Sequence, residues 1–156
     1  HATAIESGEH LLRCIVYIDL NMVRAGVVNH PSEWPFSGYN EIQKRRRKYV
    51  LINYERLREL AGFDSYQDLQ INHKRWVEAS LLNQANGRDA KWTRSLAVGS
   101  RHFIDTIRKK MGLAAKWRKQ LEDEDSFMLR ERSLPYGDDF EAKKSDIGHQ
   151  NTYSWN

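Results

Sequence analysis

One tyrosine shares a face of an expected helix with two arginines and an amide. These residues are Arg13, Tyr17, Asn21 and Arg24, and they follow one another at spacings of four, four and three positions. Side chains so spaced stand above one another, about 6 Å apart along the helix axis. A phenol acts as a nucleophile after losing a proton with a reference pKa of about 10, and nearby guanidinium groups favour the phenolate and hold a phosphodiester. The stripe indicates phosphodiester chemistry at Tyr17, although an exposed helical tyrosine taken alone is more often structural.

The positive charge of the chain is concentrated in two clusters. The net charge is +4, but residues 1–80 carry +1, residues 81–120 carry +8 and residues 121–156 carry −5. The two clusters are the run Lys44, Arg45, Arg46, Arg47 and Lys48, and the group Arg108, Lys109 and Lys110. Such blocks attract polyanions by releasing condensed counterions, so nucleic acid is the first partner to test. A solvated charged face is the alternative.

Several other chemistries lack their sequence motifs. No two histidines stand at His-x-His or His-x-x-x-His spacing, and the chain has no glycine-rich phosphate loop or nucleophile elbow. The single cysteine, Cys14, excludes an internal disulfide framework and favours a reducing, cytosolic setting. No apolar run approaches the roughly 20 residues of a membrane span, so no membrane partner is expected. Each histidine is interpreted as a surface or packing residue, and Tyr17 remains the strongest candidate for chemistry.

The tyrosine stripe belongs to a helix expected from Gly8 to Arg24. Ser7 suits its N-cap, and Gly26 suits a left-handed residue just after its end. Its apolar face is expected to comprise Leu11, Ile15, Ile18 and Met22, with Leu12, Val16 and Val23 alongside. Residues 27–39 contain two prolines and three aromatic residues, which predicts an irregular segment whose rings pack, with base stacking as the alternative.

Three shorter helices are predicted after the basic run, which itself is expected to form a loop or a short edge strand. Each begins at a polar cap and ends at a glycine or a turn: Asn53 to Gly62, Ser65 to Asn86-Gly87, and Ser100 to Gly112. They would form a small basic bundle or a helix-turn-helix-like unit. From about Lys116 the periodicity fades, which predicts a weakly ordered tail.

Two consecutive segments together resemble a known family. They are YIDLNMVRAGVV at 17–28 and HPSEWPFSGY at 30–39, and they resemble the REP-associated tyrosine transposases, which are single-tyrosine HUH-type transposases. The family pattern is Tyr-Ile-x-x-Asn-Pro-Val-Arg/Lys-Ala-Gly, followed by Pro-x-x-Trp/Tyr-x-x-Ser-Ser-Tyr. The matched core covers about residues 2–40, with looser similarity as far as Tyr136. Met22 replaces the usual proline and Gly38 the second serine, and both changes are mild.

The resemblance implies a specific reaction. In that family the motif tyrosine, here Tyr17, attacks a DNA phosphodiester to form a 5′-phosphotyrosine and release a 3′-hydroxyl. A divalent metal, Mg²⁺ or Mn²⁺, is held by a His-hydrophobic-His motif and polarises the phosphate. Asn21, one turn after the tyrosine, is a candidate to complete the metal or phosphate site. Phosphate contacts by Arg13 and Arg24 are inferred from the stripe and not from the family pattern.

The main departure from the family is the missing His-hydrophobic-His pair. In the family this pair lies on a strand of a ferredoxin-like α+β sheet upstream of the tyrosine helix, whereas this chain begins at His1. We therefore expect the mainly α, C-terminal portion of an α+β transposase, unable to cut DNA alone. The expected parts are 1–50, the tyrosine helix and its Pro/aromatic segment; 51–115, a small basic helical region; and 116–156, an acidic tail.

The functional expectation is a transposase-family protein that binds, cleaves and rejoins single-stranded or hairpin-flanked DNA. The resemblance implies a bacterial cytoplasmic protein associated with the nucleoid. A homodimer is compatible with the apolar helix face, which would lack its sheet. The alternatives are a non-catalytic DNA-binding or regulatory remnant of such an enzyme, and a pseudogene product or protein-interaction remnant with no role on DNA.

Overall fold

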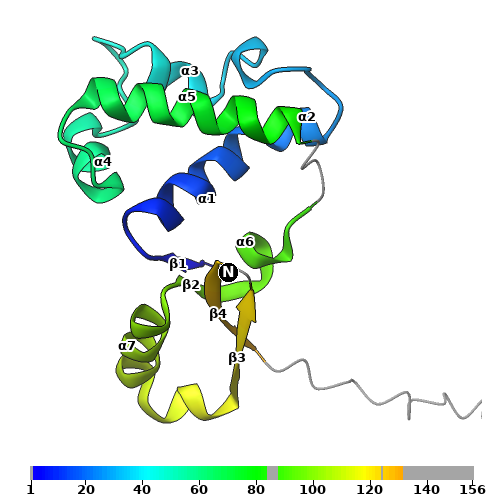
Figure 1. Cartoon of the computed structure of the whole chain (residues 1–156), viewed down its shortest axis with the longest axis vertical. Coiled ribbons are helices and arrows are strands. Elements are labelled where there is room, and N and C mark those ends of the chain that lie inside the picture. The colour runs from blue at the N-terminus through cyan, green and yellow to red at the C-terminus, as the bar shows by residue number, and fades with distance from the viewer. Residues whose placement is uncertain (1, 84–87, 124, 132–156) are drawn as a thin grey trace, which may run out of the picture.

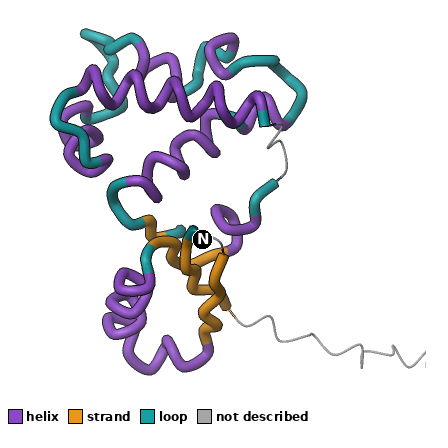
Figure 2. Tube along the Cα trace, in the orientation of Figure 1, coloured by secondary structure: helices purple, strands orange, loops and turns teal. Residues whose placement is uncertain are grey.

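Two layers make up the part of the chain that is described by a computed structural model, residues 2–83, 88–123 and 125–131. Figure 1 shows a group of helices in the upper layer and a small sheet with one flanking helix in the lower layer, and Figure 2 shows the same division by type of element. Helices thus predominate beside a four-stranded mixed sheet. No helix in these described ranges combines the length and the apolar character needed to cross a membrane.

The upper layer is built around one long helix pair. Its elements are α1 (Glu9–Asp19), α2 (Asn21–Arg24), the 3-10 turn η1 (Pro31–Glu33), α3 (Gly38–Gln43), α4 (Tyr54–Ala61) and α5 (Tyr66–Leu82). α1 packs against both α4 and α5. Two apolar clusters hold the layer together: Leu12 with Ala61, Tyr66 and Leu69, and Val16 with Leu20, Tyr39 and Val77.

The first predicted helix is divided and rotated relative to the expectation. Leu20 separates α1 from α2, although its amide and carbonyl still make helical hydrogen bonds. Ser7 as the N-cap is wrong, because Gly8, with φ 82°, occupies that position and makes no side-chain cap. Gly26 adopts the expected left-handed conformation, with φ 68°. The buried side is Leu12, Val16 and Leu20, so the predicted inward face was wrong at Ile18, which is 56% exposed.

The three predicted caps are confirmed. The side chains of Asn53, Ser65 and Ser100 accept hydrogen bonds from the amides of residues 56, 68 and 103, respectively. α4 ends at Ala61 and is followed by the left-handed cap residue Gly62, with φ 79°. α5 ends at Leu82, and the turn predicted at Asn86-Gly87 lies outside the described residues.

The lower layer contains the sheet that the sequence analysis did not anticipate. Its strands are β1 (Ala4–Ile5), β2 (Ser95–Gly99), β3 (Arg118–Asp123) and β4 (Ser126–Glu131), in the order β1-β2-β4-β3. β1 is parallel to β2, and the other pairs are antiparallel. The remaining elements are α6 (Ala90–Arg94), α7 (Arg101–Met111) and the 3-10 turn η2 (Gly112–Trp117).

Two expectations about the C-terminal half were therefore wrong. The prediction of a weakly ordered tail is wrong for residues 118–131, because they form the β3–β4 hairpin. The acidic residues there lie at the end of a strand and in the turn that follows it. Residues 132–156 lie outside the described ranges. A single bundle over 51–115 is also wrong, since α4 and α5 pack with α1 whereas α7 packs on β2 and β4 through Ile104, Ala97 and Leu129.

Candidate functional site

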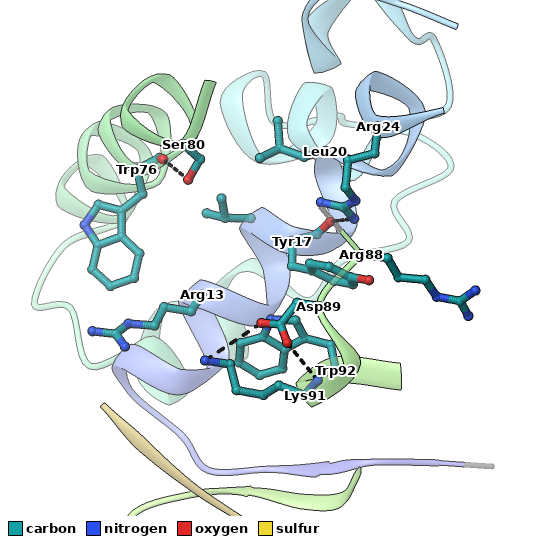
Figure 3. A pocket seen from close by; sticks show the side chains of 11 residues that line it. Arg13, Tyr17, Leu20, Arg24, Trp76, Ser80, Arg88, Asp89, Lys91 and Trp92 are labelled. Carbon is teal, nitrogen blue, oxygen red and sulfur yellow. Dashed lines mark hydrogen bonds and ion pairs between the residues drawn. The ribbon is translucent and has the colours of Figure 1, made fainter. Parts of the chain in front are cut away.

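Tyr17 lines a cavity of about 450 Å³ where α1, α2, α5 and α6 meet (Figure 3). The charged and aromatic side chains around it are Arg13, Tyr17, Arg24, Trp76, Arg88, Asp89, Lys91 and Trp92. Three members of the predicted stripe are thus brought together, and the fourth, Asn21, lines an adjoining hollow with Tyr17 and Arg24. The cavity joins residues that lie more than sixty positions apart in the sequence.

Arg24 fixes the orientation of the tyrosine ring. Its guanidinium carbon lies 3.9 Å from the centroid of the Tyr17 ring, and the group donates hydrogen bonds to the Tyr17 carbonyl and to Asn21 Oδ1. Burial lowers the pKa of Arg24 from its usual value, and Tyr17 and Asp89 partly oppose this shift. An arginine remains charged at neutral pH after such a shift. Arg24 therefore provides a fixed positive charge against the face of the phenol.

Two tryptophans complete the aromatic walls of the cavity. The Trp92 and Tyr17 rings are 6.2 Å apart and tilted by 38°, and in Figure 3 the phenol lies between Arg24 and Trp92. Trp76, from α5, lines another wall, with the Arg13 guanidinium 5.9 Å from its ring centroid. Sequence reasoning missed both tryptophans and Arg88. The one available signal for Trp92 was its position within the strongly basic segment 81–120.

Acidic side chains neutralise part of the cavity's positive charge. Lys91 Nζ lies 3.9 Å from Asp89, 3.4 Å from Asp123 and 3.6 Å from Asp125. Arg13 pairs with Glu9 and also with Asp125. Arg13 is thus in the cavity, as the phosphate-contact hypothesis requires, but two carboxylates already hold its guanidinium.

The residues around Tyr17 do not fit a divalent metal. Asn21 Oδ1, the predicted ligand, accepts a hydrogen bond from the Arg24 guanidinium, and Arg88 lines the same hollow. Fixed cations beside this oxygen oppose the binding of a divalent cation, and Asp89, the carboxylate that lines the cavity, lies 3.9 Å from Lys91 Nζ. In the described ranges no group of three or more His, Cys, Asp or Glu residues could hold a metal ion. We therefore derive no step through a metal at this site.

A buried polar network supports the helix that carries Tyr17. Asp19 Oδ1 accepts from the Tyr39 amide at 2.8 Å, and its Oδ2 lies 2.9 Å from His73 Nε2. The other ring nitrogen of His73 faces the Gln43 amide at 3.1 Å. Because Gln43 is a donor there, His73 carries its proton on Nε2 and donates to Asp19. The network joins α1, α3 and α5 two residues beyond Tyr17.

The first basic cluster forms a loop, and it does not line the Tyr17 cavity. Arg45 lies over the Tyr66 ring at 4.8 Å, and the Arg46 amide donates to the Tyr54 hydroxyl at 2.8 Å. The buried carboxylate of Glu41 closes the loop by accepting from the amides of Leu51 and Ile52. Two members of the cluster thus have structural contacts of their own, whereas the side chains of Lys44, Arg47 and Lys48 are exposed.

The second basic cluster lies at the other end of the molecule. Arg108, Lys109 and Lys110 occupy the last turn of α7, in the lower layer of Figure 1. In the aromatic segment the packing expectation is confirmed for Tyr39, which is buried, whereas Phe36 is 84% exposed and its ring meets the Trp34 ring at 5.6 Å. The structure therefore does not combine the predicted DNA-binding residues into one surface.

Comparison with known proteins adds no relative. No family model, curated protein or solved structure matches this chain.

Proposed function

We propose that this chain binds single-stranded DNA at the Tyr17 cavity, as part of a DNA strand-transfer protein of the HUH transposase class. The observation that supports this proposal most directly is that Tyr17 shares one cavity with the cations Arg24, Arg88 and Lys91 and with the Trp92 ring. Cations along a groove bind the phosphates, and aromatic rings stack on bases in a way that tolerates any sequence. The family resemblance of residues 17–39 supports the same class and a ferredoxin-like origin for the fold.

In this proposal Tyr17 is the nucleophile. Its oxygen forms a bond to phosphorus as the bond to the leaving 3′ oxygen breaks, and the phenolic proton passes to water or to the leaving oxygen. Arg24 and Arg88 would neutralise the phosphate charge. The Arg24 guanidinium that holds Asn21 Oδ1 opposes a metal ion beside Tyr17, and this contact favours the second candidate, a non-catalytic DNA-binding or regulatory form of the same class.

Binding is tested with a fluorescently labelled single-stranded oligonucleotide and the full chain. We expect Trp92→Ala and Arg24→Gln each to weaken binding by about tenfold, the effect of losing one stacked base or one charge-assisted hydrogen bond. Arg101→Gln, at an exposed position on α7, is the matched control and should bind as the parent chain does. Unchanged affinity in both cavity variants would overturn the proposal.

Cleavage separates the two candidates. The full chain is incubated with a hairpin-flanked oligonucleotide and Mg²⁺ or Mn²⁺, and a covalent adduct is sought on a denaturing gel. The non-catalytic form gives no adduct. An adduct that disappears in Tyr17→Phe would establish strand transfer by this chain alone and refute our account of its metal site.

A further inference from the structure

A second positively charged surface lies at the end of α7, remote from Tyr17. A hollow of about 500 Å³ is lined there by Arg108, Lys109, Leu113 and Lys116, among others. We define the α7-end patch as Arg108, Lys109, Lys110, Leu113, Lys116 and Trp117. In Figure 1 this end of α7 and the turn after it are the part of the lower layer farthest from the upper helices.

The lysines of the patch are not neutralised. Lys109, Lys110 and Lys116 are exposed, and none forms an ion pair within the part of the chain that the structure describes. Asp105 is the acidic residue among those lining the hollow. Lys91 at the Tyr17 cavity differs, because three carboxylates surround it. The patch therefore presents a net positive charge, which attracts a polyanion.

Two large apolar side chains lie on η2, the turn that carries Lys116: Leu113 lines the hollow, and Trp117 follows Lys116 in the chain. Leu113 is 89% exposed and Trp117 is 63% exposed. An exposed indole offers a flat face for a nucleobase, and a tryptophan is costly to leave in water without a partner. The apolar side chains of α7 itself, including Ile104 and Ile107, pack on the sheet. One indole and one leucine are too little for insertion into a membrane, which needs a whole apolar helix face.

We propose that the α7-end patch is a second binding site for single-stranded nucleic acid. Lys109, Lys110 and Lys116 would contact successive phosphates, and a base would stack on Trp117. Nucleic acid fits better than an acidic protein, because it combines regularly spaced charge with flat rings. The site goes beyond the proposed function of the Tyr17 cavity and does not depend on it.

The test measures binding of the full chain to a labelled single-stranded oligothymidylate at several salt concentrations. Trp117→Ala should weaken binding by about 5- to 100-fold, and Trp117→Phe should restore most of it. The pair Lys109→Gln and Lys116→Gln should lower the slope of log affinity against log salt by about 0.7 for each lysine. Lys74→Gln, an exposed lysine on α5, is the charge-matched control and should leave the slope unchanged.

The outcomes separate this site from the Tyr17 cavity. If Trp117→Ala and the double lysine variant bind as the parent does, the second site is refuted, whatever Arg24→Gln does. If they lose affinity while Arg24→Gln and Trp92→Ala do not, the second site stands and the proposed function of the cavity fails. Vesicles of phosphatidylserine and phosphatidylcholine form the third arm. Loss of vesicle binding with unchanged oligonucleotide binding would identify a lipid surface and overturn the proposal.

Discussion

The Asp19 carboxylate is 6% exposed and lies two residues after the candidate nucleophile. A buried carboxylate is stable only when its oxygens are fully hydrogen-bonded, and here the Tyr39 amide and His73 Nε2 satisfy them. The pattern that revealed Tyr17 could not reveal this pair, because Asp19 and His73 are 54 positions apart. Local helical spacing identifies side chains on one face, but it does not show which distant residue that helix will contact.

Asp19→Asn is expected to destabilise the protein by about 2–3 kcal/mol. The new amide nitrogen would face the His73 N–H, so two donors would oppose each other in a buried site. The free energy of unfolding from urea titration measures the change. Asp64→Asn, at an exposed position, is the control and should change stability by less than about 0.5 kcal/mol. Equal stabilities for the two variants would show that the network contributes nothing.

Tyr66 makes the stability of the upper layer sensitive to alkaline pH. Burial raises its pKa to about 12, with a contribution from Tyr54 and an opposing one from Arg45. In the unfolded chain the phenol titrates near 10. The folded state therefore holds the proton more tightly, and its stability is complete below pH 10 and falls as pH rises from 10 to 12. The expected slope is about 1.4 kcal/mol per pH unit.

Tyr66→Phe should remove this part of the alkaline slope. At neutral pH the cost is about 1 kcal/mol for the lost hydrogen bond to the Ile42 carbonyl, which Gln70 still satisfies. Chemical unfolding at a series of pH values measures both effects. Tyr49→Phe, at a residue 90% exposed, should keep the slope of the parent. A slope unchanged in Tyr66→Phe would assign the alkaline transition to other groups.

At the scale of elements, the helix caps other than Ser7 were predictable, whereas contacts between distant strands were not. Asn53, Ser65 and Ser100 were identified correctly because a cap depends on a few consecutive residues. The sheet was missed because β1 has only two residues, and its partner β2 lies some 90 positions later. The β3–β4 hairpin was missed because its charged residues obscured the alternation of its strands.

Gly99 joins β2 to α7, and the structure leaves no room there for a side chain. A Cβ at this position would lie 2.6 Å from Phe103 Cδ1 and 2.7 Å from Glu6 Cβ. Gly99→Ala should therefore cost about 1–3 kcal/mol in the free energy of unfolding, as an overpacked core does. Gly38→Ala, where the new methyl group meets one Asp19 oxygen at 3.1 Å, is the matched control and should cost less.

A double variant tests the cause. Phe103→Leu removes the ring edge, so Gly99→Ala combined with Phe103→Leu should lose less than the sum of the two single losses. Purely additive losses would show that the ring is not the obstacle.

At the scale of the whole molecule, charge complementarity joins the two layers beside the Tyr17 cavity. Asp123 at the end of β3 and Asp125 in the turn after it pair with Lys91 on α6, and Asp125 also pairs with Arg13 on α1. The sequence showed an excess of acid after residue 120 and an excess of base before it. It could not show that the acidic turn reaches back to the cations of the Tyr17 cavity, because this depends on the hairpin that was not foreseen.

These carboxylates occupy cations that DNA phosphates would otherwise use, so removing them should strengthen binding. Under the proposed function, Asp123→Asn with Asp125→Asn should raise the affinity for single-stranded DNA by about three- to tenfold at low salt. The pairs are half-exposed, so unfolding free energy should fall by no more than about 1 kcal/mol for each. Oligonucleotide titrations at low and high salt measure the gain, which should shrink as salt rises.

Glu122→Gln, an exposed acid on β3, is the control for net charge. An equal gain per charge removed in Glu122→Gln would show that only the overall charge matters, whereas a gain confined to the aspartate variants would mean that the turn competes with DNA for Lys91 and Arg13.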